Sequence, residues 1–252
     1  MTRCCRPRSP LRDRSLYRRL GADGDFEFFE STDGTRSNWD PEIQHGSPPL
    51  ALMTKLIEDG RRDVRSASRR HRAGGRPRHG GCWRPATPDI VTDRYPPLVE
   101  GEAAPVPHNW VGAKGYFETV IWRRQQTAEG ESNVAWLSPT VPLVDSEEMT
   151  DLQRLATIAD SVNGVGMALD PEKFVFMNTD TVVHLHRLPA GNDFGLRARG
   201  SFGPDGIGVT SAEVFDRQGF VGTVAQTLLV QRRAGDRSIC GCIPTPHPLA
   251  QN

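Results

Sequence analysis

The chain has 252 residues, which is enough for one large domain or two small ones. Lys and Arg together number 31, as do Asp and Glu, so the formal net charge is zero and gives no reason to expect a nucleic-acid or anionic-membrane partner. No apolar run approaches the roughly 20 residues that span a bilayer, and no apolar core of a secretory signal follows the basic start MTRCCRPRSP. We therefore expect a cytoplasmic protein without a membrane span.

The first part of the chain predicts few ordered elements. Residues 1–15 are rich in Arg and Pro and are expected to be disordered. An aromatic, strand-like stretch begins at Phe26. Apolar residues then recur at helical spacing and predict a short helix over residues 47–59, with an apolar face made of Leu50, Met53, Leu56 and Ile57.

The next segment, Gly60–Arg84, is dense in Arg and contains no Leu, Ile or Phe. Such a segment cannot bury enough apolar area to offset the entropy of ordering it. A solvated basic linker is the preferred interpretation over an RNA-binding arm, because only Trp83 interrupts the arginines with an aromatic ring. A third possibility is that this stretch is not authentic coding sequence.

The remainder has clear periodicity after a Pro-rich, loop-like segment at residues 85–107. It predicts one helix, with Thr150 as N-cap and Gly164 at its end. The predicted elements are strands at 115–124 and 133–141, the helix at 149–163, and strands at 173–187, 194–202, 206–216 and 220–232. Turns join the last three strands into an antiparallel meander, so the prediction is an α+β layer. The tail at 234–252 is expected to be loose.

Several runs carry a resemblance to a known family: LQRLATIADSVNGVG, FVFMNTDTVVHLHRLPAG and GPDGIGVTSAEVFDRQGFVGTVAQTLLV. They resemble the C-terminal half of double hot-dog acyl-CoA thioesterases of the thioesterase II type. The earlier run WDPEIQHGSPPLALMTKLIED resembles the helix entry of the N-terminal hot dog in that family. The resemblance implies two hot dogs side by side, each a long helix wrapped by an antiparallel sheet, and a thioester hydrolysed at their junction without a metal.

The resemblance also implies a division of the chain. A disordered basic N-terminus at 1–15 precedes a partial, degenerate N-terminal hot dog at 16–84. A Pro-rich linker at 85–107, a complete C-terminal hot dog at 108–233 and the loose tail at 234–252 follow. The strands that should follow the first helix are replaced by the Arg-rich segment. A frameshift or a deletion would produce that pattern and would leave the first hot dog truncated.

Three positions match the residues that hold the attacking water in this family. Asp160 in TIADSVNG matches the helix Asp, and Gln226 in VAQTLLV matches the Gln of the last strand. The family's Thr or Ser falls on Asn178, with Thr179 beside it. Neighbouring strand residues point to opposite faces, so only one of Asn178 and Thr179 can line the site. Asp160 would deprotonate water, and Gln226 with Asn178 or Thr179 would hold it.

His45 and Gly46 precede the first predicted helix and are candidates for substrate binding. Gly46 would let backbone approach a ligand closely, and a helix N-terminus can offer amide donors to a thioester oxygen or a phosphate. Pro48 and Pro49 remove two of those amides.

Other candidates carry less chemistry. His184 and His186 share one strand face, but no third ligand is spaced to join them, so a solvent-facing strand explains both and no metal is expected. Ser201 and Ser211 lack the pattern of a nucleophile elbow, which argues against a serine hydrolase.

The predicted function is hydrolysis of an acyl-CoA thioester to free acid and CoA, with no cofactor beyond the CoA of the substrate. The alternative is a catalytically inactive hot dog that binds acyl-CoA or lipid, or that serves as a dimerisation scaffold. A homo-oligomer is expected from the resemblance.

Overall fold

In the computed structural model, the described residues are 15–24, 26–40, 42–70, 94–105, 114–128 and 131–233, with the backbone alone described for 61–70. The expectations of disorder before residue 15 and of a loose tail after residue 233 lie outside these ranges. So does most of the Arg-rich segment, from residue 71 on.

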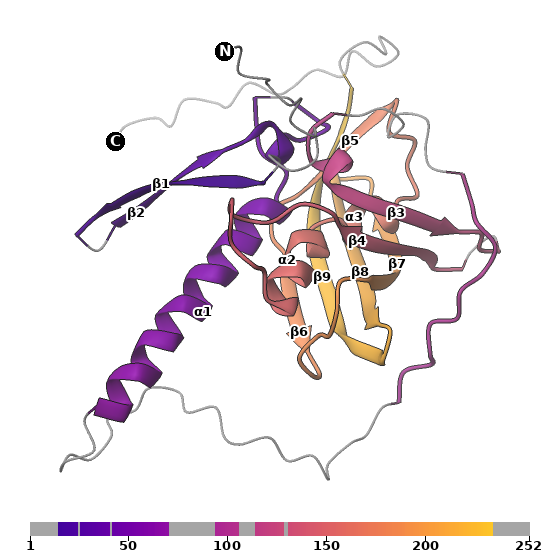
Figure 1. The fold of residues 1–252 in the computed structure, drawn as a ribbon. Helices are drawn as coiled ribbons and strands as arrows, with labels where there is room; N and C mark the ends of the chain where they lie inside the picture. Colours follow the sequence, from indigo (N-terminus) through magenta and orange to yellow (C-terminus); the bar gives the residue numbers. More distant parts are fainter. Residues whose placement is uncertain are drawn as a thin grey trace, which may run out of the picture.

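The C-terminal part forms one curled antiparallel sheet (Figure 1). Its strand order is β3-β4-β7-β8-β9-β5, and β6 also pairs with β9. The strands are β3 (Val120–Gln125), β4 (Asn133–Pro139), β5 (Phe174–Asn178), β6 (Val182–Leu185), β7 (Phe194–Phe202), β8 (Ile207–Asp216) and β9 (Gly219–Arg232). The predicted meander of the last three strands is present as β7-β8-β9, because glycine-containing turns join consecutive strands.

Two helices in tandem, α2 (Asp151–Ala159) and α3 (Val162–Val165), lie against the concave face of this sheet (Figure 1). Thr150 caps α2 as predicted, because its hydroxyl accepts from the Gln153 N–H. The main core joins Leu155 and Ile158 of α2 to strand residues such as Phe194 and Leu196, all nearly inaccessible to solvent. A helix wrapped by an antiparallel sheet confirms the α+β, hot-dog fold class.

Two predicted elements are interrupted. The predicted helix at 149–163 breaks at Asp160 and Ser161 and resumes as α3. The predicted strand at 173–187 splits into β5 and β6. Asn178 pairs with Leu228 of β9, and Val182 pairs with Ala225 of β9. Between these two pairs, the segment that joins β5 to β6 has one more residue than the facing segment of β9. The extra residue makes a bulge, which changes the face to which later side chains point.

The strand predicted at 115–124 begins later than expected. Its first residues form a 3₁₀ turn, η3 (Tyr116–Thr119), and β3 follows. Gly115 enters the turn with φ of 92°, a conformation that favours glycine, and packs against the Arg36 backbone. This turn brings the Tyr116 ring into the core.

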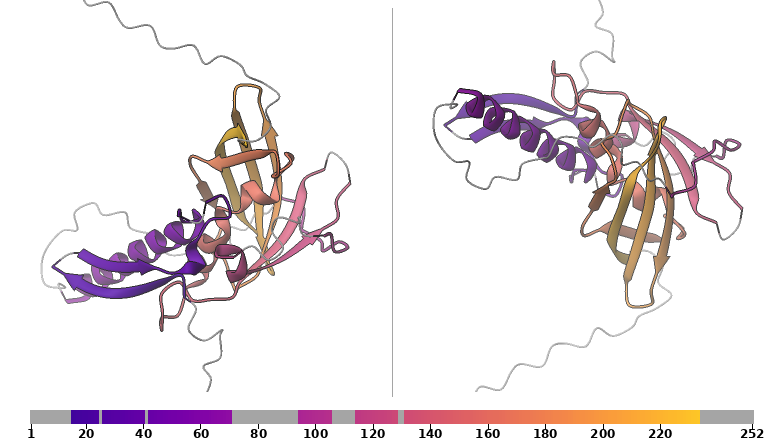
Figure 2. Two further views of the ribbon diagram at one scale, coloured as in Figure 1. Left: turned by 90° about the horizontal axis from the view of Figure 1, so that it is seen from above. Right: turned by 90° about the horizontal axis from the view of Figure 1, so that it is seen from below.

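The N-terminal part is an arm that lies beside the sheet domain. It contains the hairpin β1 (Tyr17–Asp23) and β2 (Phe26–Ser31), the 3₁₀ turn η1 (Asp33–Thr35) and the helix α1 (Ser47–Arg70). Figure 2 shows the hairpin and α1 side by side, projecting away from the sheet. A small apolar cluster that includes Tyr17, Ala51 and Ala156 joins the base of the arm to α2.

The prediction that this helix ends at Asp59 is wrong, because α1 continues to Arg70. This part of the sequence lacks the apolar pattern on which the prediction relied, but Arg, Ser and Ala are compatible with a helix. No helix among the described residues is long and apolar enough to cross a membrane.

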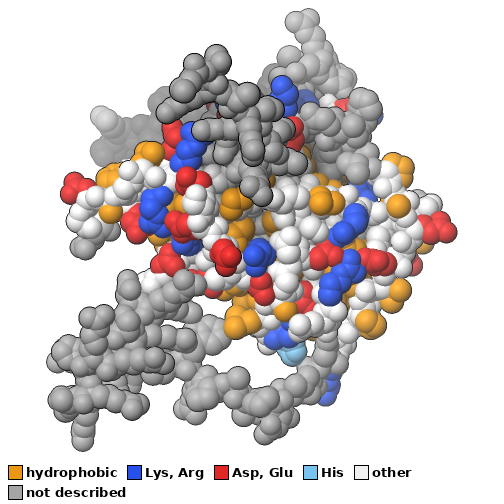
Figure 3. Space-filling model, in the orientation of Figure 1, with side chains coloured by type: hydrophobic (Ala, Val, Ile, Leu, Met, Phe, Trp, Pro, Cys, Tyr) orange, Lys and Arg blue, Asp and Glu red, His pale blue; other side chains and the backbone are white. Residues whose placement is uncertain are grey.

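The arm leaves apolar side chains uncovered. Met53 and Ile57 of α1 are 55% and 58% exposed, and Phe26 of β2 is 73% exposed. In the face drawn in Figure 3, hydrophobic groups reach the surface at the end where the hairpin projects. The described part of the chain therefore gives α1 one covered face, toward α2, and leaves the opposite apolar residues in solvent.

The described part of the predicted Pro-rich linker, residues 94–105, packs on the outer face of the sheet. Tyr95 stacks on Phe220 with ring centroids 3.8 Å apart, and Leu98 joins the cluster of Trp136, Phe215 and Phe220. This segment therefore covers part of the convex face. The domain boundaries stay predictions.

Replacing a residue of the main core should show how much the helix-on-sheet packing contributes. Ile158→Ala, at a position with no solvent exposure, should lower the free energy of unfolding by about 2–5 kcal/mol. Ile207→Ala removes the same atoms from an exposed strand position and should cost less than about 1 kcal/mol. Urea unfolding of both variants measures the difference, and equal losses would contradict this account of the core.

Candidate active site

Asp160 lies where α2 ends, between the helix pair and the sheet. Its backbone is still helical, and its N–H bonds to the Ile158 carbonyl, so the helix tightens and turns at this residue. Ala159 before Asp160 and Ser161 after it are both buried, so this part of the chain runs inside the domain and the Asp160 side chain is buried with it. The residue is only 5% exposed, and a buried carboxylate requires donors around it.

Three side chains supply those donors, two from strands of the sheet and one from the connection between β5 and β6. The Asn178 amide, at the end of β5, donates to Asp160 Oδ1, and the Thr181 hydroxyl lies 3.1 Å from the same oxygen. The Gln226 amide, on β9, donates to the Asp160 backbone carbonyl at 3.1 Å and lies 3.5 Å from Oδ1. Asn163 in α3 donates to the Asn178 Oδ1 at 3.4 Å and so fixes the orientation of that amide.

The other side of the carboxylate faces the start of α1. Gly46 lies so close that a Cβ at this position would be 2.5 Å from Asp160 Oδ2. His45 Nδ1 lies 3.5 Å from the same oxygen and 3.2 Å from the Ser47 N–H. The carboxylate is therefore enclosed between the sheet domain and the first turn of the arm, and both halves of the described chain contribute to the site.

His45 is buried and stacked on the Tyr116 ring, with centroids 3.8 Å apart. Burial lowers the pKa of His45, and the Asp160 charge opposes this only in part, so the imidazole is neutral at physiological pH. Its Nδ1 cannot both accept from the Ser47 N–H and donate to Asp160. The neutral ring favours the acceptor form at Nδ1, which places the proton on Nε2.

Tyr116 supports this stack from η3. Its hydroxyl donates to the Thr157 carbonyl at 2.6 Å and lies 2.9 Å from the Ser161 hydroxyl. Burial raises the pKa of Tyr116, so the phenol stays protonated. The ring thus ties His45 of the arm to the end of α2.

Most of the residues singled out from the sequence come together here. Asp160, Asn178, Gln226, His45 and Gly46 form one cluster. Their roles stay predictions.

Thr179 lies elsewhere: it is exposed, and its hydroxyl contacts the Thr227 carbonyl at 3.3 Å. The alternation within β5 therefore places Asn178, and not its neighbour, on the Asp160 side.

Thr181 was missed by the sequence reasoning. A continuous strand over 173–187 would point Asn178 and Thr181 to opposite faces, whereas the bulge between β5 and β6 brings both to Asp160. The short run of Asp and Thr at 179–181, which favours irregular backbone, was the one available signal.

The other candidates lie apart from this cluster. His184 and His186 are exposed on and just after β6, and Ser201 and Ser211 are exposed on β7 and β8. Within the described ranges, no group of three or more His, Cys, Asp or Glu side chains could hold a metal ion.

Two hollows adjoin the region. A cavity of about 20 Å³ beside His45 and Asn163 has mainly aromatic and apolar walls, including Phe117, Trp122 and Phe176. A volume of this size accommodates about one water molecule.

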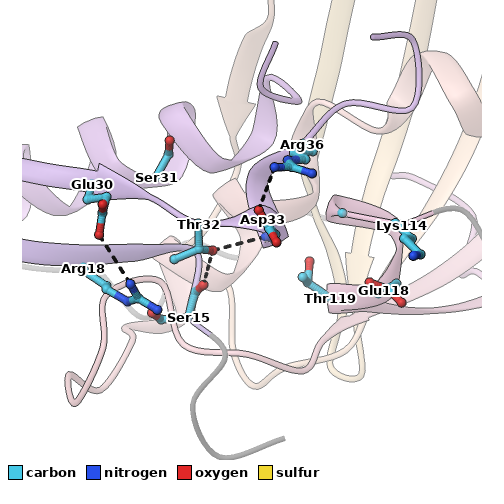
Figure 4. A pocket seen from close by; sticks show the side chains of 12 residues that line it. Ser15, Arg18, Glu30, Ser31, Thr32, Asp33, Arg36, Lys114, Glu118 and Thr119 are labelled. Carbon is cyan, nitrogen blue, oxygen red and sulfur yellow. Dashed lines mark hydrogen bonds and ion pairs between the residues drawn. The ribbon is translucent and has the colours of Figure 1, made fainter. Parts of the chain in front are cut away.

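The second hollow, of about 650 Å³, lies between the hairpin and η3 and is polar (Figure 4). Its arginines already face acids, with Arg18 paired to Glu30 and Arg36 to Asp33. None of the side chains that contact Asp160 lines it, so it is a separate feature.

Comparison with known proteins agrees with the fold. The family described as acyl-CoA thioesterase C-terminal domain matches residues 92–230, which is more than half of the chain. The chain therefore belongs to this acyl-CoA thioesterase family. The match begins before residue 94 and so includes the segment that covers the outer face of the sheet. No curated protein matches the chain.

Solved structures with similarity to the chain include the acyl-CoA thioesterase II TesB2 of Mycobacterium marinum, at 15% identity and a TM-score of 0.40, covering 58% of this chain and 60% of that one. A putative thioesterase II of Thermobifida fusca is similar at 16% identity and a TM-score of 0.38, covering 56% and 57%. The BH2602 protein of Bacillus halodurans, crystallised with CoA, is similar at 19% identity and a TM-score of 0.34, covering 44% and 74%. The chain thus spans less than two thirds of the two thioesterase II structures.

The buried imidazole should make stability depend on pH. The unfolded chain binds a proton at His45 below about pH 6.5, whereas burial lowers the pKa in the folded state. The folded state is therefore favoured above pH 6.5 and loses stability as the pH falls, at up to about 1.4 kcal/mol per pH unit. Urea unfolding at pH 7.5, 6.5 and 5.5 should show a shallower loss for His45→Asn. His184→Asn removes an exposed imidazole as the control, and equal slopes for both variants would refute the assignment.

The contact between Gly46 and Asp160 should not tolerate a side chain. Gly46→Ala places a methyl group against a carboxylate that Asn178 and Thr181 already hold, and should destabilise the fold by about 1–3 kcal/mol. Gly60→Ala is the matched control, because it has open space around it within α1 and should gain up to about 1 kcal/mol. Thermal unfolding checks both signs, and an unchanged Tm for Gly46→Ala would show that α1 does not press on Asp160.

Proposed function

We propose that this chain hydrolyses an acyl-CoA thioester to the free acid and CoA, with Asp160 as the base that activates water. One observation carries the proposal: a buried carboxylate is held by side-chain donors of the sheet and faces the first turn of a long helix. Family membership supports the substrate class. Buried ionisable groups with specific partners are common at catalytic centres.

The proposed chemistry is direct hydrolysis. A water between Asp160 and the thioester loses a proton to the carboxylate as its oxygen attacks the carbonyl carbon. The carbon–sulfur bond then breaks, and the proton held by Asp160 passes to the leaving sulfur to give the CoA thiol. Hydrogen bonds from Asn178 and Thr181 to Oδ1 fix that oxygen and leave Oδ2, on the Gly46 side, as the proposed proton acceptor.

The first turn of α1 is the proposed site for the charge that develops on the thioester oxygen. Backbone N–H groups at a helix N-terminus stabilise negative charge. Pro48 and Pro49 contribute no N–H, so the donors would be Gly46 and Ser47, with the Ser47 N–H exchanging its bond to His45 for one to substrate. The arm is therefore a required half of the proposed site.

The aromatic cavity beside His45 is the proposed start of the acyl-chain path, because its walls are apolar and it adjoins the cluster. Its volume suits about one water, so an acyl chain must displace side chains such as Phe117 or Trp122 to enter. Assembly as a homo-oligomer in the cytoplasm is part of the proposal, as it was of the sequence prediction.

A binding protein without turnover is the second candidate. It is favoured by the packing of Gly46 directly on the Asp160 carboxylate, which leaves the residue 5% exposed. A substrate carbonyl can reach this carboxylate only if α1 shifts. Such a binding protein would release no thiol, and removing the charge of Asp160 would leave its acyl-CoA affinity unchanged.

Thiol release from acyl-CoAs of several chain lengths tests the proposal, with Asp160→Asn in parallel. General-base catalysis contributes typically 10²–10⁴-fold, so kcat should fall by about that factor in the variant while acyl-CoA still binds. Asp205→Asn is the matched control, since it makes the same change in an exposed turn between β7 and β8 and should keep full activity.

Each outcome has a meaning. Release that survives in Asp160→Asn would remove the carboxylate from the mechanism. Binding by the folded protein without any release would favour the binding protein. Neither binding nor release would leave a family member whose role lies outside acyl-CoA chemistry.

A further inference from the structure

The Ser47 side chain lies at the start of α1 and is completely buried. Ser47 is 0% exposed, and its Oγ has no hydrogen-bond partner among the residues that the structure describes. Buried polar groups are nearly always hydrogen-bonded, because an unmatched one loses its bonds to water without replacement. A buried hydroxyl without a partner therefore needs an explanation.

Capping of the helix does not explain this hydroxyl. A Ser at the start of a helix usually accepts a hydrogen bond from the N–H of the second or third residue after it. Pro48 and Pro49 have no N–H, and the Leu50 N–H already donates to the Gly46 carbonyl at 3.2 Å. The first turn of α1 therefore leaves no backbone donor for the Ser47 oxygen.

The neighbouring phenol does not explain it either. The Ser47 hydroxyl lies near the Tyr116 hydroxyl, but not in hydrogen-bonding geometry. Tyr116 has other partners, since it donates its single proton to the Thr157 carbonyl at 2.6 Å and lies 2.9 Å from the Ser161 hydroxyl. The Ser47 proton is therefore unused within the described part of the fold.

This hydroxyl belongs to the part of the arm that contacts the proposed base. The preceding residue, Gly46, packs directly on Asp160 Oδ2. The Ser47 N–H, one of the proposed donors to the thioester oxygen, bonds to His45 Nδ1 at 3.2 Å. Because two prolines follow, this helix N-terminus has fewer free amides than others offer. A side-chain donor at this point would replace one of them.

We infer that the Ser47 hydroxyl is a further donor to the thioester oxygen and is thus a catalytic residue of the proposed reaction. This inference rests on the proposed function. The bond from the hydroxyl strengthens as negative charge develops on that oxygen, while Asp160 takes the proton of the attacking water. Substrate meets the buried hydroxyl when α1 shifts from Asp160, a movement that the reaction already requires. The hydroxyl then gains the partner that the described fold does not provide.

Removal of the hydroxyl alone tests the inference, because Ser47→Ala keeps the backbone N–H and so separates the two donors. Ser47→Ala should lower kcat for thiol release by roughly 100-fold, the loss typical of one oxyanion donor, with KM little changed. Since no hydrogen bond within the fold is lost, its Tm should equal that of the parent or rise. Steady-state kinetics and thermal unfolding of the full chain measure both effects.

Ser138→Ala is the matched control, because it removes the same group where that group has a partner. The Ser138 hydroxyl, on β4, donates to Asp193 Oδ1 at 2.8 Å. This variant should give the opposite result, with a lower Tm and parental kcat. Ser47→Cys keeps a group of similar shape that is only a weak donor, so its kcat should lie between those of the parent and Ser47→Ala.

Failure of the inference and failure of the proposed function give different results. A parent that releases thiol, with the same kcat in Ser47→Ala, overturns the inference and leaves the function standing. If Ser47→Ala does not fold, or loses as much Tm as Ser138→Ala, the hydroxyl has a role inside the fold, which also overturns the inference. A folded parent that releases no thiol overturns both.

Discussion

The Asp160 carboxylate is removed from water almost completely, and its charge can persist there only if hydrogen-bond donors converge on it. Several irregular features of the fold meet that requirement. The break between α2 and α3 turns the side chain inward, and the bulge between β5 and β6 brings two donors, Asn178 and Thr181, to one carboxylate oxygen. Without the bulge, Thr181 would point to the face opposite Asn178 and away from the carboxylate.

The same carboxylate explains why α1 matters to a domain that contains its own sheet and helices. The arm exposes Met53, Ile57 and Phe26, so its far end adds little to the core. Its base is different: Gly46 presses on Asp160, and His45 stacks on Tyr116, which bonds to the end of α2. A close contact between the arm and the sheet domain therefore coincides with the proposed reaction centre.

Regular structure was predictable because periodic apolar residues mark it directly. The β7-β8-β9 meander and the Thr150 cap follow from turn residues and a single capping side chain, both of which act locally. The extent of α1 was not predictable from the sequence, because its last residues, up to Arg70, form a helix without the apolar pattern on which the prediction relied.

The site was predictable only in part for a related reason. Asp160, Asn178 and Gln226 were singled out through the resemblance, and the structure places them within one hydrogen-bonded cluster. The position of the Thr181 side chain depends on a bulge between β5 and β6. The bulge is set by the pairing of these strands with β9, and the residue types in the segment do not predict it. Gly46 and Asp160 are far apart in sequence, so their contact required the tertiary structure.

A single turnover in ¹⁸O-labelled water, with the protein in excess over acyl-CoA, tests the central claim that Asp160 activates water. The account predicts that thiol is released and that the free acid carries ¹⁸O, because the new oxygen comes directly from solvent. Release of acid without the label would mean that the carboxylate itself attacked the thioester and gave up its own oxygen. Such a result, or no release at all from the folded chain, would contradict the account.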